Sequence, residues 1–218
     1  MSYKRYRRTT FCWTLISVML WSCSEKITNP TGQANVQGLL LTSSGAPAKG
    51  AVVRFVKTGS DPRIGLSKRM AVVDSTITGN DGSYSAQIDT GTYNVLAGGD
   101  SGLAYQDSVF VGDSSTTVPP DTLKAPGTIA GKVELQNADD PRTVFILVLG
   151  AGKFVTPAAD GAFGLQEMAE GTYDVRILAT LDDYSPLDTR FTVRAGMMDT
   201  IPENIILPFR GIPIATGL

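Results

Sequence analysis

Two short motifs could carry covalent chemistry, a serine in Gly99-Asp100-Ser101-Gly102 and a lysine in Gly150-Ala151-Gly152-Lys153. A serine nucleophile of the first kind needs a histidine as base, and the sequence contains none. A phosphate-binding loop would need glycine at Leu147 and serine or threonine at Phe154. We therefore predict a polar loop for the first motif and a hairpin turn between two strands for the second.

Paired carboxylates could support glycoside hydrolysis or bind a hard cation without histidine. The adjacent pairs are Asp139-Asp140 and Asp182-Asp183, and each stands beside a turn signal, Pro141 and Tyr184-Ser185-Pro186 respectively. Both pairs are typical of solvated loops, and no Asp-x-Asp-x-Asp spacing supports a calcium site. We expect no metal, no cofactor and no catalytic residue.

Composition excludes further classes of function. The two cysteines, Cys12 and Cys23, leave no pair for an internal disulfide after the leader, and zinc sites of Cys and His are excluded. The formal charge is −2, but residues 1–22 hold four basic side chains and no acid. Without them, 15 basic residues face 21 acidic ones, a charge of −6. An acidic chain without a basic run is a poor nucleic-acid binder.

The first 22 residues have the pattern of an export signal. Residues 2–10 are basic and polar, and residues 11–21 form an apolar run too short to span a bilayer comfortably. Leu20-Trp21-Ser22-Cys23 then resembles a bacterial lipobox, in which cleavage precedes the cysteine. The resemblance implies a signal peptide at 1–22, a lipid on Cys23 and anchoring in a membrane. Arg7-Arg8 lacks the rest of a twin-arginine pattern, so we predict general secretion.

Residues 23–34 are polar and contain Pro30 and Gly32, which predicts a flexible tether after the lipid. Ser24 follows the cysteine, and by enterobacterial analogy a residue other than aspartate favours the outer membrane.

The rest of the chain repeats itself. Asp81-Gly82-Ser83-Tyr84 and Gly91-Thr92-Tyr93 return as Asp160-Gly161-Ala162-Phe163 and Gly171-Thr172-Tyr173. We read two copies of one unit, with a boundary near 125–127. The β-branched and aromatic runs at 51–56, 143–149, 173–177 and 191–194 predict strands, and the two Asp-Gly pairs predict hairpin turns. Residues 165–170 could form one helical turn.

The first copy, with Gly38, Gly50-Ala51, Asp81-Gly82-Ser83-Tyr84 and Gly91-Thr92-Tyr93, resembles the carboxypeptidase regulatory-like family. The second copy, with Gly131, is a weaker match. The resemblance implies an all-β chain of two tandem seven-stranded transthyretin-like β-sandwiches, at 35–125 and 126–211, with a tail at 212–218. The family module supplies no catalytic residues.

The aromatic residues of the motif have structural roles in this interpretation. Tyr84 and Phe163 should point into the cores. Tyr93 and Tyr173 should close the sandwich edges and pair their hydroxyls with backbone groups. Tyr105 and Tyr184 lie outside the motif, so we treat them as free surface aromatics that could hold a sugar ring.

The first copy carries about 11 residues more than the second between Phe55 and Asp81. The added stretch, residues 57–70, contains four cations of an otherwise acidic protein: Lys57, Arg63, Lys68 and Arg69. Such a loop could contact anionic headgroups, lipopolysaccharide or an acidic partner. A surface excursion without a ligand is an equally good interpretation.

These observations favour a non-catalytic, lipid-anchored envelope protein with an interaction, adhesion or accessory role. Its membrane contact is the lipid on Cys23, and its other partner is a protein or polysaccharide of the envelope. The first alternative is a carbohydrate-binding module that assists polysaccharide degradation. The second is an enzyme that uses aspartate and glutamate alone.

Overall fold

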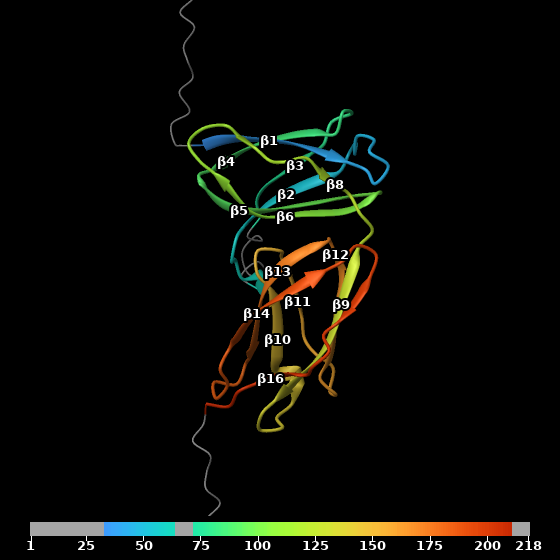
Figure 1. Cartoon of the computed structure of the whole chain (residues 1–218). Coiled ribbons are helices and arrows are strands. Elements are labelled where there is room, and N and C mark those ends of the chain that lie inside the picture. Colours follow the sequence, from blue (N-terminus) through green and yellow to red (C-terminus); the bar gives the residue numbers. More distant parts are fainter. Residues whose placement is uncertain (1–32, 64–71, 211–218) are drawn as a thin grey trace, which may run out of the picture. The chain divides into compact units, whose positions relative to one another are not determined.

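The first repeat folds into two facing sheets (Figure 1). A computed structural model describes residues 33–63 and 72–210. One sheet has the order β3-β2-β5-β6, and in the other β1 lies between β4 and the short strands β7 and β8. The strands are β1 (Gln33–Leu41), β2 (Val52–Lys57), β3 (Val72–Ile77), β4 (Ser83–Asp89), β5 (Gly91–Gly99), β6 (Gly102–Val111), β7 (Thr116–Thr117) and β8 (Asp121–Thr122).

The second repeat has the same arrangement. Its sheets are β11-β10-β13-β14 and β12-β9-β15, with β16 also paired to β9. The elements are β9 (Gly127–Leu135), a 3-10 turn η2 (Pro141–Thr143), β10 (Val144–Val148), β11 (Lys153–Val155), β12 (Ala162–Met168), β13 (Gly171–Ala179), β14 (Leu187–Val193), β15 (Met198–Thr200) and β16 (Ile205–Leu207). The predicted pair of tandem β-sandwiches is confirmed.

The last strand of each sandwich is interrupted. Strands β7 and β8 both run parallel to β1, beside Val36–Gln37 and Leu40–Leu41 respectively. Strands β15 and β16 follow β9 in the same way. Prolines stand at the interruptions, Pro119-Pro120 and Pro202, and proline has no N–H for the ladder. Within residues 33–63 and 72–210, each sandwich therefore has seven strands, the seventh in two pieces.

The strands predicted at 51–56, 143–149, 173–177 and 191–194 correspond to β2, β10, β13 and part of β14. Strand β1 begins at Gln33, two residues before the predicted start of the first sandwich. The helical turn predicted for 165–170 is wrong. Most of that segment is strand β12, whose register shifts between Leu165 and Met168, where Glu167 has a φ of 52°. The apolar spacing there reflects a β-bulge.

The Asp-Gly pairs make tight turns, but they are not hairpins within one sheet. Gly82 and Gly161 have φ of 76° and 83°, which favours glycine as predicted. The strands on either side, β3 and β4 in the first copy, belong to opposite sheets. Each glycine also packs on the first strand of its sandwich. The Leu40 and Val133 N–H groups donate to the Gly82 and Gly161 carbonyls at 2.9 Å.

The aromatic residues after these turns point inward, as predicted. Tyr84 and Phe163 are 7% and 6% exposed. Each lies opposite a glycine of the first strand, Gly38 and Gly131 respectively. A Cβ on either glycine would collide with the aromatic ring. In each copy, the glycine therefore makes room for the aromatic ring on the neighbouring strand.

Tyr93 and Tyr173 hold the turn that precedes their own strand. The Tyr93 hydroxyl donates to the Asp89 carbonyl, and the Tyr173 hydroxyl donates to the Ala169 carbonyl, both at 2.9 Å. Both rings are buried. The predicted pairing of these hydroxyls with backbone is confirmed in both copies. Burial raises the pKa of both phenols, because it disfavours the charged form.

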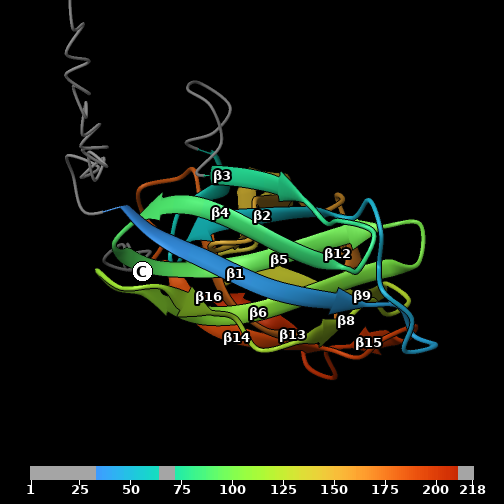
Figure 2. The same ribbon diagram turned by 90° about the horizontal axis from the view of Figure 1, so that it is seen from above.

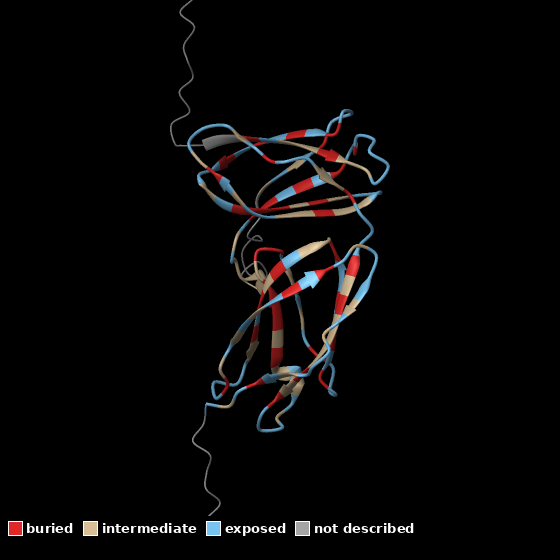
Figure 3. Ribbon diagram, viewed as in Figure 1, coloured by how far each residue is buried: buried red, intermediate tan, exposed pale blue. Residues whose placement is uncertain are grey.

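Each sandwich has its own apolar core, where buried residues line the inner faces of the strands (Figure 3). Strand β4 alternates exposed and buried residues along its whole length. Central core residues are Val36, Val53, Phe55, Tyr93 and Val111 in the first, and Val133, Val144, Ile146, Tyr173 and Ile177 in the second. Contacts also join the sandwiches, which belong to one compact unit.

The crowding around the Asp-Gly turn predicts a graded effect of alanine. Gly152→Ala should cost about 1 kcal/mol, because Gly152 has a φ of 67° but open space around it. Gly161→Ala should cost about 3 kcal/mol or more, because the added Cβ also collides with the Val133 carbonyl oxygen. Chemical denaturation of both variants measures the difference. Equal losses would contradict the packing role of Gly161.

Candidate functional site

The structure describes four of the predicted site residues, Lys57, Arg63, Tyr105 and Tyr184. Cys23, Lys68, Arg69 and the tail at 212–218 lie outside the described residues. Lys57 ends β2 and is exposed, and Arg63 lies in the connection that follows. The two tyrosines, by contrast, are engaged in packing.

Tyr184 is not a free surface aromatic, so this expectation is wrong. Its side chain is only 3% exposed, and its hydroxyl donates to Asp139 Oδ2 at 2.6 Å. Its ring contacts Phe209 edge to face at 5.4 Å. Burial, with the Asp139 carboxylate, raises the pKa of Tyr184 to about 12. Asp139 thus joins two segments of the second sandwich, which the sequence pattern did not indicate.

Tyr105 is also engaged, which corrects the second expectation. Its ring stacks on Tyr173 with the centroids 4.2 Å apart and the planes at 23°. Tyr105 belongs to β6 of the first sandwich, whereas Tyr173 belongs to β13 of the second. A Cβ on Gly171 would lie 2.6 Å from Tyr105 Cδ1, so glycine there permits the stack. Burial raises the pKa of Tyr105. The ring therefore joins the two sandwiches.

Asn94 is the polar centre of this junction. It is 2% exposed, and β6 forms a bulge opposite it. The Asn94 Oδ1 accepts from the Ser108 N–H at 3.1 Å and from the Thr58 hydroxyl at 3.0 Å. Its Nδ2 donates to the Gly150 carbonyl of the second sandwich at 3.2 Å. The amide thereby ties together β5, the β6 bulge, the β2–β3 connection and the β10–β11 turn.

The motif around Gly150 is a hairpin turn between β10 and β11, as predicted. The backbone of this turn contacts the first sandwich. The Gly150 N–H donates to the Ser60 carbonyl at 2.9 Å, and a Cβ on Gly150 would lie 2.5 Å from Asn94 Nδ2. The glycine that resembled part of a phosphate loop is thus required for close approach between the repeats. The serine motif at 99–102 is the turn between β5 and β6, also as predicted.

The described start of the added stretch contacts the second sandwich. Arg63 binds Asp61 through both Nε and Nη2, the latter at 2.7 Å. The Arg63 guanidinium lies over the Phe145 ring, with Cζ 5.4 Å from the centroid. The same guanidinium lowers the pKa of Asp61 through their hydrogen bond. Arg63 therefore has protein partners, and the hypothesis that it serves an outside anion loses support.

Two contacts near the connecting segment complete the junction. Lys124, after β8, forms an ion pair with Glu170, before β13. The Gly196 N–H donates to the Ala125 carbonyl at 3.0 Å. Both ion-pair side chains are about half exposed, so we assign little stability to them. Stacking and the buried amide contribute more.

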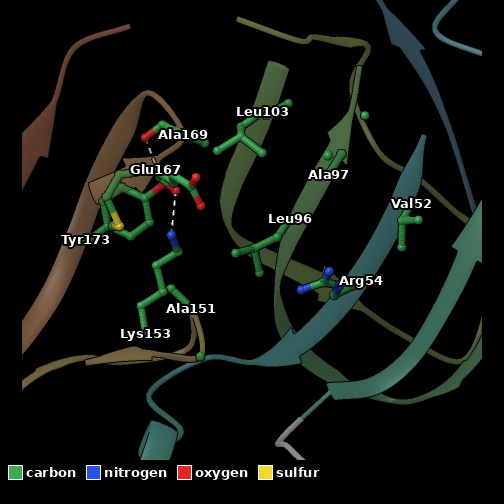
Figure 4. A pocket seen from close by; sticks show the side chains of 15 residues that line it. Val52, Arg54, Leu96, Ala97, Leu103, Ala151, Lys153, Glu167, Ala169 and Tyr173 are labelled. Carbon is green, nitrogen blue, oxygen red and sulfur yellow. Dashed lines mark hydrogen bonds between the residues drawn. The ribbon is translucent and has the colours of Figure 1, made fainter. Parts of the chain in front are cut away.

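A cavity of about 380 Å³ lies at this junction (Figure 4). Val52, Leu96 and Leu103 form an apolar wall, and the polar lining includes Arg54, Lys153 and Glu167. The Lys153 ammonium donates to the carbonyls of Gln166 and Glu167 at 2.8 and 2.6 Å, and burial lowers the Lys153 pKa. The Lys153 side chain therefore binds the backbone at the β12 bulge.

The cavity offers little for hydrolysis. Glu167 is the one carboxylate among the residues that line it, whereas glycoside hydrolysis needs two facing carboxylates. Within residues 33–63 and 72–210, His, Cys, Asp and Glu form no group of three or more that could hold a metal ion. The Asp139-Asp140 pair instead has partners within the second sandwich. Asp140, for example, caps η2 and binds Arg142.

No family model matches the chain, and no curated protein matches it. Solved structures do show similarity. A minor pilin of Streptococcus agalactiae shares 13% identity over 85% of this chain and 100% of the other, with a TM-score of 0.42. A streptococcal ancillary pilin shares 13% over 81% and 63%, with a TM-score of 0.33. The shaft pilin SpaA of Lactobacillus rhamnosus GG shares 12% over 83% and 99%, with a TM-score of 0.29.

Where the structure describes the chain, it contains no helix of the length and apolar character needed to cross a membrane.

The junction predicts that Asn94 is more important for stability than an exposed asparagine. Asn94→Ala should lower the free energy of unfolding by about 2–4 kcal/mol, because a Ser108 N–H, a Thr58 hydroxyl and the Gly150 carbonyl lose their partner. The exposed Asn137→Ala is the control and should change it by less than about 0.5 kcal/mol. Denaturant unfolding measures both, and similar values would contradict the role of Asn94.

Proposed function

We propose that this chain is a non-catalytic, lipid-anchored module of the bacterial cell envelope, which presents two joined β-sandwiches for interaction with another envelope component. The lipid on Cys23 is the anchor, and residues 24–32 precede the first strand. Nine extended residues reach about 30 Å, enough to hold a domain away from headgroups. By the enterobacterial analogy for the residue after the cysteine, here Ser24, we favour the outer membrane.

The proposal rests on one observation: polar and aromatic side chains at the junction bind other parts of the protein. Asn94 and Tyr105 bind the second sandwich, and Lys153 binds backbone carbonyls. These three side chains position the domains, so none of the three is free to attack a substrate. A joined pair of sandwiches suits a spacer or adhesive module, whereas an enzyme requires free reactive groups in a cavity.

Carbohydrate binding has less support than an interaction role. The two aromatics that suggested it, Tyr105 and Tyr184, are stacked and buried respectively. A sugar platform needs an exposed ring face. We therefore assign the interaction to sheet edges and loops, where backbone and polar groups are accessible.

Lipid attachment is tested by replacing each cysteine in turn. Cys23→Ala should abolish both the incorporation of labelled palmitate and the cleavage of the leader, because the thiol is the attachment point and cleavage follows its acylation. Cys12→Ala lies in the apolar run of the leader and is the matched control. It should retain both properties. Incorporation of palmitate by Cys23→Ala, or a cleaved leader in that variant, would overturn the proposal.

A further inference from the structure

The cavity at the junction lies against the outer face of one sheet of the first sandwich. Strands β2, β5 and β6 lie side by side in that sheet (Figure 2). Two rows of paired residues cross these strands on the outer face: Arg54–Leu96–Tyr105 and Val52–Gly98–Leu103. Leu96 and Tyr105 also pack against the core of the second sandwich, whereas the row with Gly98 is left to line the cavity.

The second sandwich supplies the opposite wall of the cavity. This wall includes Ala151 in the β10–β11 turn and Met168 and Ala169 at the end of β12, and all three residues are buried. Clefts between domains are common positions for ligand pockets, and a volume of about 380 Å³ is at the small end of their range. The cavity therefore suits a short apolar body that contacts both sandwiches.

The charged side chains of the lining leave one positive charge uncompensated. Lys153 and Glu167 lie together on the second sandwich, where the Lys153 ammonium donates to the Glu167 carbonyl, so their charges offset each other (Figure 4). Arg54 belongs to the first sandwich, is exposed, and is paired across the sheet with the uncharged Ser75 and Leu96. Among the residues that the structure describes, no hydrogen bond or ion pair involves the Arg54 guanidinium.

We propose that this cavity binds a small monocarboxylate with a short hydrocarbon chain. The carboxylate accepts two parallel hydrogen bonds from the exposed Arg54 guanidinium, and the chain lies on Leu96, Gly98 and Leu103. A single negative charge matches the one uncompensated cation, whereas a phosphate monoester brings about two. The site goes beyond the proposed envelope role, and it does not depend on the lipid on Cys23.

The charge of the ligand is tested with octanoate and its neutral analogue octanol. Both are titrated by calorimetry into the full-length chain in lipid nanodiscs, with empty nanodiscs as the blank. Arg54→Gln should weaken octanoate binding about tenfold or more and leave octanol binding unchanged, because only the carboxylate contacts the guanidinium. Arg190→Gln removes the same charge from β14, outside the cavity, and should change neither ligand. A wild-type chain that binds no octanoate, or equal weakening by both variants, would overturn the proposal.

A second variant tests the apolar floor of the cavity. A Cβ on Gly98 would lie 3.1 Å from Leu103 Cδ2, a side-chain atom that can move, so a side chain at this position enters the cavity. Valine also suits a strand, and denaturant unfolding checks that the variant folds. Gly98→Val should weaken octanoate and octanol alike, by about tenfold or more. Wild-type affinity for octanoate in the folded variant would place the ligand elsewhere and refute the site.

Methyl spectra of the leucine-labelled wild-type chain locate the ligand without any substitution. Octanoate should shift the methyl signals of Leu96 and Leu103, because the hydrocarbon chain lies on them. Leu187 is the internal control, since it lines a separate groove of about 300 Å³ beside β14 in the second sandwich. Its signals should stay in place. Larger shifts at Leu187 than at Leu96 and Leu103 would contradict binding at the junction.

Discussion

A buried amide sets the geometry on which the junction depends. Asn94 is enclosed by two sandwiches, so each of its polar atoms needs a protein partner, because a buried group without one costs about 1–3 kcal/mol. Three partners from three separate segments meet that need. The bulge in β6, with Ser108 at a φ of 55°, exists at the place where its N–H reaches the amide. The local irregularity is thus a consequence of the junction.

Equivalent positions in the two repeats make different contacts. Asn94 occupies the position of Asp174, which is partly exposed and binds Arg190 on the surface. Tyr173 follows the same rule as Tyr93 inside its own sandwich, yet its ring face also receives Tyr105. The two copies have corresponding cores, and residues at their outer positions make the contacts between them. The stretch after β2 contributes to this fit through Ser60 and Arg63.

The edges differ between the repeats for a related reason. Strand β12 is bent by a bulge and covered by Lys153, close to the cavity at the junction. Strand β4 pairs with β1 without a register shift.

Sequence alone determined the repeated sandwich, because its signals are local. The Asp-Gly turns, the inward aromatics and the tyrosines that bind backbone four residues earlier depend on short spacing and on the two-residue period of strands. The tertiary structure decided everything that joins distant segments. Asn94, the burial of Tyr184 against Asp139 and the stacking of Tyr105 all link residues from separate parts of the chain. Those partners are brought together by the tertiary fold, and no short spacing in the sequence indicates which residues will be in contact.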